Sequence, residues 1–387
     1  MTTTNSLDRA DLRSVAAGIG QDVAGPAAAD VDRQARFPRE SIEALRDARM
    51  LSAYVPTECG GAGASLAEIA GAVEALGQQC ASTAMIFAMH QIQVACLVRH
   101  GRTGYWRALT GEIADAQLLL GSATTEAGIG GDVRSSSCAV EVAGDTFQLK
   151  KNAPVISYGA YSDLILVTAR RTPDSPPNDQ VLVACRTPGL SLRPTSEWDT
   201  LGFRGTCSPG FMLEAGGSVD AIMDDSYGDI SSQTMLPVSH ILWSSAWLGL
   251  ATAAVDTARR FVRGQARNRP GVTPPGALRV AELVAVHQQM KELVHGAARR
   301  FDEAAGSVDE LSGLGFAIAM NSLKVAASSL VVDIVGSAML ICGIAGYRED
   351  SEYSLGRHLR DAYGAALMVN NDRILGNSAQ LLLVSKD

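Results

Sequence analysis

The segment Thr124–Asp132 has the composition of a ligand-binding loop, since it reads Thr-Thr-Glu-Ala-Gly-Ile-Gly-Gly-Asp ahead of an alternating, strand-like run. Its glycines Gly128, Gly130 and Gly131 permit positive φ angles and let the backbone approach a planar ligand closely. A cluster of β-turns has the same composition. The loop alone therefore indicates a candidate binding site without identifying its ligand.

Two histidines are candidates for moving protons. His90 lies in the apolar segment Phe87-Ala88-Met89-His90-Gln91, where a histidine is either a hydrogen-bonded core residue or a proton carrier. His240 begins an apolar segment with helical spacing and can serve as a base or as a helix cap. The sequence leaves both pairs of alternatives open.

The elements that must position these residues follow from the spacing of apolar side chains. The spacing is helical from Leu12 to about Ala116, with Ser41 expected to cap one of the helices. Alternating runs then predict short strands, including a hairpin that turns at residues 143–145. Helical spacing returns from about Ser239. We therefore predict an α+β fold with an all-α domain (1–116), a β domain (117–232) and a helical bundle (233–387).

Composition restricts the classes of partner and location. The chain has 387 residues, 47% of them hydrophobic, and a net charge of -8 without a long basic run, which argues against a nucleic-acid partner. Its seven cysteines are scattered and lack Cys-x-x-Cys spacing, so we expect no disulfide scaffold, no metal site and a cytoplasmic location. The first residues lack the apolar core of a signal peptide, and polar residues interrupt the apolar stretch 325–347, so we expect no membrane span.

Several segments, in order along the chain, resemble motifs of the acyl-CoA dehydrogenase family. The loop above is similar to the family's Thr-Glu-Pro-x-x-Gly-Ser-Asp, and residues 55–63 are similar to its Pro-Glu-x-x-Gly-Gly-x-Gly. Residues 152–157 resemble its Trp-Ile-Ser strand, and residues 198–208 its Leu-Gly-x-Arg-x-Thr-x-Ser. Gly343-Ile344-Ala345-Gly346-Tyr347 and Arg357-His358-Leu359-Arg360-Asp361-Ala362 resemble Gly-Gly-x-Gly-Tyr and Arg-x-x-Arg-Asp-Ala. The chain is identified on these motifs as an atypical member.

This resemblance implies a fold, a cofactor and a set of site residues. The fold would be an N-terminal helical domain, a β-barrel-like central domain and a C-terminal four-helix bundle, assembled as a homo-oligomer, either tetramer or dimer. The cofactor would be FAD. The resemblance assigns cofactor contacts to Thr125, Gly130, Ile156, Ser157, Arg263, Arg267, Gly343 and Asn371, and substrate contacts to Gly131 and Asn370.

The chain differs from the family motifs at the positions of the catalytic base and of several flavin contacts. The base that removes the α-proton of an acyl thioester is usually a Glu nine residues after the Arg of Arg-Asp-Ala, and that position is Val369 here. The other position at which some members carry this Glu matches Ser239, beside His240. The flavin-stacking Trp, the Ser of Gly-Ser-Asp and the Gln before Gly-Gly-x-Gly-Tyr are replaced by Val155, Gly131 and Leu340.

Three functions fit these motifs. The first is an FAD-dependent dehydrogenase of a thioester carried by coenzyme A or an acyl carrier protein, with an atypical base or position and an electron-transfer flavoprotein as electron acceptor, similar to members in secondary metabolism. The second is a flavin monooxygenase of the same fold, using oxygen and a flavin reductase, since that sister group places a His and a Ser where His90 and Ser157 stand. The third is a non-catalytic scaffold. The sequence favours the first.

Overall fold

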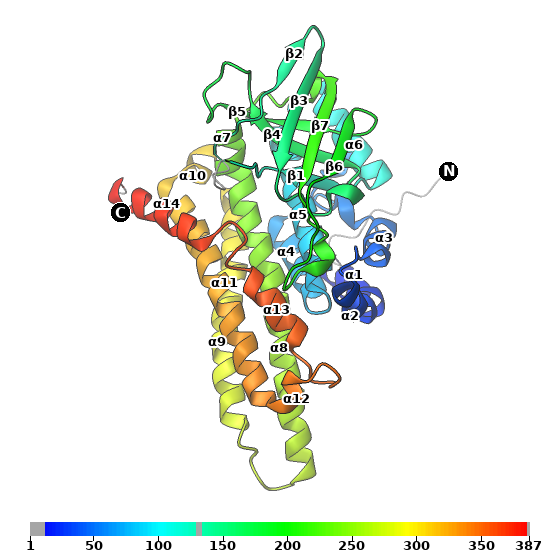
Figure 1. Ribbon diagram of the computed structural model, residues 1–387. Helices are drawn as coiled ribbons and strands as arrows, with labels where there is room; N and C mark the ends of the chain where they lie inside the picture. The colour runs from blue at the N-terminus through cyan, green and yellow to red at the C-terminus, as the bar shows by residue number, and fades with distance from the viewer. Residues whose placement is uncertain (1–11, 129–133, 385–387) are drawn as a thin grey trace.

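The computed structural model describes residues 12–128 and 134–384. Helices, then strands, then helices follow one another along the chain (Figure 1). The N-terminal helices are α1 (Leu12–Ile19), α2 (Gly25–Gln34), α3 (Arg39–Asp47), α4 (Leu66–Gly77), α5 (Ala81–His100) and α6 (Gly104–Ala116).

The strands of the described residues form two separate open sheets, β1-β4-β5 and β2-β3-β7-β6. Strand β1 pairs in parallel with β4, and all other pairs are antiparallel. The expected α+β fold of this family is confirmed, but these strands do not close into the barrel-like domain that we predicted. The strands are β1 (Leu120–Ala123), β2 (Glu141–Ala143), β3 (Thr146–Ala153), β4 (Leu164–Arg170), β5 (Gln180–Cys185), β6 (Leu190–Pro194) and β7 (Phe211–Ser218).

The C-terminal helices begin with α7 and a π-helical turn (Ser231–Met235) that leads directly into α8. Helices α8, α9 and α11 run side by side as the long arm of the molecule, and α13 and α14 lie along α11 (Figure 1). These helices are α7 (Tyr227–Ile230), α8 (Leu236–Asn268), α9 (Ala277–Ala304), α10 (Val308–Leu311), α11 (Leu314–Cys342), α12 (Ile344–Tyr347), α13 (Gly356–Gly364) and α14 (Asn371–Val384).

The local sequence explains where α4 begins, but it predicts the wrong first residue for α3. Ser65 and Glu68 form a capping box at the start of α4, each side chain bonding the backbone N–H of the other. Helix α3 begins at Arg39, after Pro38, and Ser41 lies inside it as a buried residue. The prediction of Ser41 as a cap is therefore wrong, because the helix already begins two residues earlier, directly after Pro38 at the N-cap.

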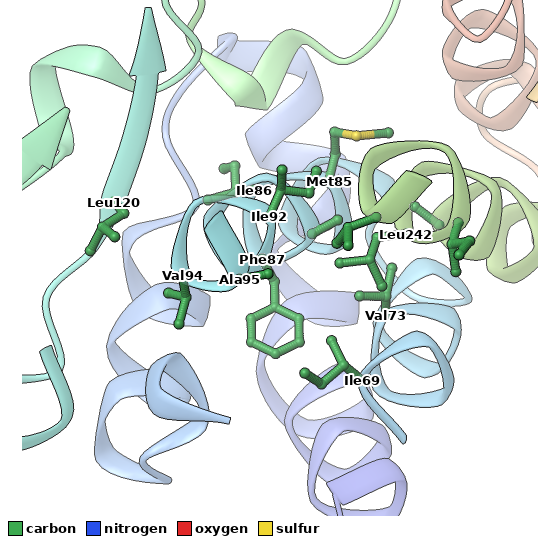
Figure 2. Close-up of a cluster of buried hydrophobic side chains, with 14 of the residues drawn as sticks. Ile69, Val73, Met85, Ile86, Phe87, Ile92, Val94, Ala95, Leu120 and Leu242 are labelled. Carbon is green, nitrogen blue, oxygen red and sulfur yellow. The ribbon is translucent and has the colours of Figure 1, made fainter. Parts of the chain in front are cut away.

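Helix α5 runs through the main hydrophobic core. Figure 2 shows Phe87 of α5 against Ile69 of α4, and the same cluster includes Leu242 of α8. Within the described part of the chain, three helical segments are long and apolar enough to cross a membrane by length and composition: Ala81–His100, Tyr227–Asn268 and Leu314–Cys342. In the apolar 18-residue window of the first two segments, 89% and 83% is buried inside the protein, so packing accounts for their apolar character. In the window of the third segment, only 44% is buried.

Two glycines let α4 and α8 touch through their backbones. A Cβ atom added to Gly249 of α8 would collide with the carbonyl oxygen of Glu74 and with Gly77 of α4. A Cβ atom added to Gly77 would lie 2.7 Å from the carbonyl oxygen of Ala246. The N-terminal helices and the C-terminal bundle are thus in contact where no side chain fits between them.

We expect Gly249→Ala to lower the free energy of unfolding by about 1–3 kcal/mol, because overpacking forces backbone shifts. Urea denaturation followed by circular dichroism measures this. Gly296→Ala is the matched control, since Gly296 lies in α9 with no atom within 4 Å of an added Cβ. That variant should be neutral or up to about 1 kcal/mol more stable, because alanine favours helix. Equal effects of the two variants would contradict this account.

Glu74 carries a buried carboxylate that joins three helices. Arg13 of α1 donates two hydrogen bonds to it, at 3.0 and 3.1 Å, and His295 of α9 lies 2.8 Å from its Oε2. Burial alone would raise the pKa of Glu74, but the hydrogen bonds from His295 and Arg13 outweigh it and lower the pKa from 4.5 to about 2.

This lowered pKa makes the stability of the protein depend on pH. The folded-state pKa of Glu74 is below its unfolded value, so its contribution is complete above about pH 4.5 and is lost as pH falls towards about 2. We expect a loss of about 3 kcal/mol across this window that Glu74→Gln does not show, measured by denaturant unfolding at each pH. Glu214→Gln should change the pH dependence far less, because the pair of Glu214 with Lys150 is exposed and solvent screens it.

Candidate functional site

A cavity of about 590 Å³ lies where the N-terminal helices, the β domain and the C-terminal bundle meet. Its walls come from α5, from the residues after β1 and β3, from the loop 198–208, from the start of α8 and from the turn after α13. Most of the lining is apolar, and four methionines contribute to it: Met85, Met89, Met235 and Met368. The volume is in the range of small-molecule and cofactor sites.

The β-domain wall presents hydroxyl groups. Thr125 lines the cavity and donates a hydrogen bond from Oγ1 to the carbonyl of Val155 at 3.0 Å. Ser157 also lines it and accepts from Ser208 Oγ at 3.0 Å, which leaves its own hydroxyl proton available to a ligand. Ile156, between the two lining residues, is fully buried, because successive side chains of an extended segment point to opposite sides.

The C-terminal helices contribute to the lining the positions at which the family motifs predict a carboxylate. Val369, Ser239 and His240 all line the cavity. Val369 has a φ of 44°, which is an outlier for a β-branched residue. Its carbonyl accepts a hydrogen bond from Lys324 Nζ at 3.1 Å, so a buried lysine helps to hold this turn.

Lys324 places a buried ammonium group against the backbone of Val369. Its Nζ also donates to Asn371 Oδ1 at 2.7 Å, and Asn371 in turn donates to Ser328. The charged group has no acidic partner among the described residues, and burial lowers its pKa to about 8. Asn371 thus supports the Val369 turn through Lys324, while Asn370 caps the start of α14 by accepting from the N–H of Asp372 at 2.8 Å.

His240 is held in one tautomer. Its Nδ1 donates to the carbonyl of Met320 at 3.0 Å, so in the neutral ring Nε2 carries the lone pair. Nε2 has no hydrogen-bond partner in the part of the chain that the structure describes. Burial, with a smaller effect of the nearby Lys324, lowers the pKa of His240 to about 3. The imidazole is therefore an acceptor of hydrogen bonds and a weak base.

Glu126 and Asp361 each follow a lining residue in the sequence, but both carboxylates are engaged elsewhere. Glu126 accepts from the Oγ of Ser136 at 2.7 Å and from the N–H groups of Ser137 and Cys138, which anchors the loop that follows β1. Asp361 is buried and accepts from the N–H of Phe203 at 2.6 Å. Burial raises the pKa of Asp361 to about 6. Within residues 12–128 and 134–384, no Asp or Glu side chain lines the cavity.

His90 is placed apart from these residues. Its Nε2 donates to the carbonyl of Leu51 at 2.7 Å, and its Nδ1 accepts from the N–H of Leu120 at 3.0 Å. It does not line the described cavity, and burial lowers its pKa to about 4. The structure therefore does not bring His90 to Ser157, and its contacts favour the core role that the sequence left open.

The remaining predicted residues are dispersed. Arg263 and Arg267 are exposed near the end of α8, and Gly343 ends α11 with a φ of 60°. These positions lie on the long arm, away from the cavity lining (Figure 1). Gly130 and Gly131 lie outside the described residues. Sequence reasoning did not find Gln93, Trp243 or Lys324, although a lysine within the apolar stretch of α11 was a usable signal.

Comparisons with known proteins place the chain in a family. The model described as "Acyl-CoA dehydrogenase, N-terminal domain" matches residues 7–110, and "Acyl-CoA dehydrogenase, C-terminal domain" matches residues 229–368. The chain is 24% identical over 360 residues to the probable acyl-CoA dehydrogenase fadE25 of Mycobacterium leprae, covering 91% of this chain and 89% of that protein. It is 25% identical over 344 residues to the human mitochondrial short-chain specific acyl-CoA dehydrogenase, covering 87% and 80%.

A solved structure with the same fold is FMN-bound TdsC, a dibenzothiophene monooxygenase from Paenibacillus sp. A11-2, with a TM-score of 0.85. It is 18% identical and covers 96% of this chain and 97% of that one. The chain belongs to the acyl-CoA dehydrogenase family. Family membership and the flavin-bound neighbours support a flavin cofactor and an oxidoreductase.

The residues present fit a flavin ring between the β domain and the turn after α13. Ser157 offers a free hydroxyl proton, Val155 offers a partly exposed apolar surface, and Met368 and Val369 lie among the lining residues of the same cavity. These four residues would hold the ring system. Arg263 and Arg267, the predicted contacts of the cofactor phosphates, do not line this cavity.

We expect Ser157→Ala to weaken flavin binding about fivefold, because one hydrogen bond is worth roughly 1 kcal/mol. Fluorescence titration of the flavin-free protein measures this. Ser208→Ala should give a smaller loss, since it only frees the Ser157 hydroxyl to rotate. Ser191→Ala, on β6 and away from the lining, should bind flavin as the wild type does. Unchanged affinity in Ser157→Ala would place the ring elsewhere.

Proposed function

We propose that this chain is a flavin-dependent monooxygenase-type oxidoreductase that transfers oxygen to an apolar substrate in the cavity. The observation that carries this proposal is the lining of the cavity, which has no carboxylate among the described residues and has Val369 where the family's base stands. The sequence alone favoured a dehydrogenase. The geometry favours a reaction that needs no base of that kind.

The physical argument compares what the two reactions require. Dehydrogenation of an acyl thioester removes an α-proton, which needs a base of matched pKa. The hydroxyls of Ser157 and Ser239 are not bases, and burial lowers the pKa of His240 to about 3, which makes its imidazole a weak base. Oxygen transfer needs a site that excludes water, and the four methionines and other apolar side chains of the lining supply it.

The balance of the proposed reaction is simple. When bound, reduced flavin supplies two electrons, so that O2 and two protons yield one oxygen atom on the substrate and one molecule of water. The chain's own residues bind the substrate, exclude water and orient a hydroxyl donor, Ser157, on the β-domain wall. A flavin reductase would be the partner that supplies the reduced cofactor.

The second candidate is dehydrogenation of an acyl thioester bound to coenzyme A or to an acyl carrier protein, with an electron-transfer flavoprotein as partner. Both family models and the curated relatives named above favour it, because their names describe acyl-CoA dehydrogenases. A base would then have to be His240, or the hydrogen removed would have to be acidified by a neighbouring group on the substrate.

A homo-oligomer stays a prediction, as does the cytoplasmic location. Apolar side chains on the C-terminal helices support the oligomer: Leu340, Ile344, Tyr347 and Leu367 are each more than 70% exposed. Single chains seldom expose so many large apolar groups together. A second copy that covers them could also bring Arg263 and Arg267 to a neighbouring flavin.

Two measurements on the flavin-loaded protein separate the candidates. With reduced flavin, isotopically labelled O2 and a panel of aromatic sulfides, amines and indoles, the proposal expects labelled oxygen in a product. Without oxygen, a panel of coenzyme A and carrier-protein thioesters should leave the flavin oxidised. Rapid bleaching of the flavin by a thioester, with no labelled product from any substrate, would establish the second candidate instead.

We expect Val369→Glu to introduce thioester oxidation. A carboxylate at this position would act as the missing base, and base catalysis is worth about 10²–10⁴-fold. The rate of anaerobic flavin reduction by a saturated acyl-CoA measures it. Val369→Gln has nearly the same shape without the charge and should show no gain. If Val369→Glu also shows none, the missing carboxylate is not what separates this chain from a dehydrogenase.

A further inference from the structure

The ammonium group of Lys324 is a buried positive charge with only uncharged partners among the described residues. Lys324 is fully buried in α11. Its Nζ donates to the carbonyl of Val369 at 3.1 Å and to Asn371 Oδ1 at 2.7 Å, and it lies 5.9 Å from the centre of the Trp247 ring. These dipoles and the π face of the indole stabilise the ammonium group, but they leave its charge uncompensated.

The acidic residues near this turn do not supply a counter-charge. Asp372 follows Asn371 directly, but it is exposed to solvent and is followed by Arg373, which is also exposed. Asp361 of α13 is buried, and its carboxylate accepts from the N–H of Phe203. Burial alone lowers the pKa of Lys324, and no carboxylate raises it. Lysines are seldom fully buried without a paired acid, so this charge calls for a partner outside the chain.

A single residue separates Lys324 from the cavity. Val369, whose carbonyl holds the ammonium group, lines the cavity, and so does His240. The charge of Lys324 already acts on the lining, since it contributes to the lowered pKa of His240. Most of the lining is apolar, so little polar material weakens the field. A ligand that lies against Val369 is therefore in a positive potential.

The flavin ring is a ligand whose charge changes at this place. The residues that fit the ring include Val369 and Met368. The ring system is neutral when it is oxidised, whereas two electrons and one proton leave the reduced ring with one negative charge. Since a charge close to the ring tunes its electronic properties, a buried cation beside it favours the reduced form.

We propose that Lys324 supplies the counter-charge of the reduced flavin, so that this buried lysine raises the reduction potential of the bound cofactor. Lys324 acts through the Val369 turn and not by contact, which makes it a positioning residue that also provides charge. The inference rests on the flavin cofactor of the proposed function. It does not rest on oxygen transfer, because dehydrogenation of a thioester also produces reduced flavin.

The first test removes the charge. Lys324→Gln keeps a hydrogen-bond donor for the carbonyl of Val369 and is uncharged. At pH 7 the wild-type side chain is protonated, since its pKa is about 8. We expect the affinity for reduced flavin to fall at least about tenfold relative to that for oxidised flavin, which lowers the reduction potential by about 30 mV. Chemical reduction of the flavin-loaded protein against a reference dye measures the potential. The affinity for oxidised flavin should change little, because the oxidised ring carries no charge.

The second test cancels the charge and keeps Lys324 in place. Asn371→Asp puts a carboxylate of the same shape at the atom that already accepts from Nζ at 2.7 Å. Ser328, which now accepts from Asn371, can donate to the new carboxylate. We expect the potential to fall here as well, while the bond from Lys324 to Val369 remains. If Lys324→Gln lowers the potential and Asn371→Asp does not, the cause is the shape of the turn, and the inference is overturned.

The matched control is another lysine that faces solvent. Lys150 of β3 is exposed and pairs with the exposed Glu214, so solvent screens its charge. Lys150→Gln should therefore leave the potential unchanged. A shift in Lys150→Gln as large as that in Lys324→Gln would overturn the inference. Wild-type potentials in both Lys324→Gln and Asn371→Asp would do so too.

The outcome is separable from that of the proposed function. If both variants lower the potential but no substrate gains labelled oxygen, the inference stands and the oxygen-transfer proposal fails. If a substrate gains labelled oxygen while both variants keep the wild-type potential, the inference alone fails.

Discussion

The backbone contact between α4 and α8 is the constraint on which the arrangement of this molecule depends. With Gly77 and Gly249 at the contact, the two helices approach more closely than any pair with side chains could. Helix α5 packs against both of them, and the cavity occupies the space that α5 and the first turns of α8 leave beneath the β domain. The N-terminal helices and the bundle are therefore fixed to each other before a ligand binds.

The electrostatics of the cavity are the reverse of those expected for this family. Where the family motifs predict a carboxylate, this chain has the aliphatic side chain of Val369, and the charged group bonded to the carbonyl of Val369 is the ammonium of Lys324. Lys324 supports the strained Val369 turn, and its charge adds to the burial that keeps His240 neutral. One buried lysine thus acts on both the shape of the wall and its capacity to accept protons.

The order of elements and the family were accessible from sequence, because helical and strand spacing and the motifs are local patterns. The contact of Val369 and Ser239 with one cavity was also expected, since the family motifs predict it. The partners of His90 were not, because the carbonyl of Leu51 and the N–H of Leu120 come from segments distant in sequence. For the same reason the contact of Lys324 with the carbonyl of Val369 could not be predicted. The open sheets were missed because alternation predicts strands but not whether their edges meet.

The methionines that line the cavity have a consequence of their own. Thioether side chains are flexible and polarisable, so a wall of Met85, Met89, Met235 and Met368 can adjust to substrates of different outline. The same sulfur atoms are readily converted to sulfoxides, which are polar and would no longer suit an apolar wall. Any oxidant released in this cavity without a substrate would meet these thioethers first, so idle turnover would damage the site that produced it.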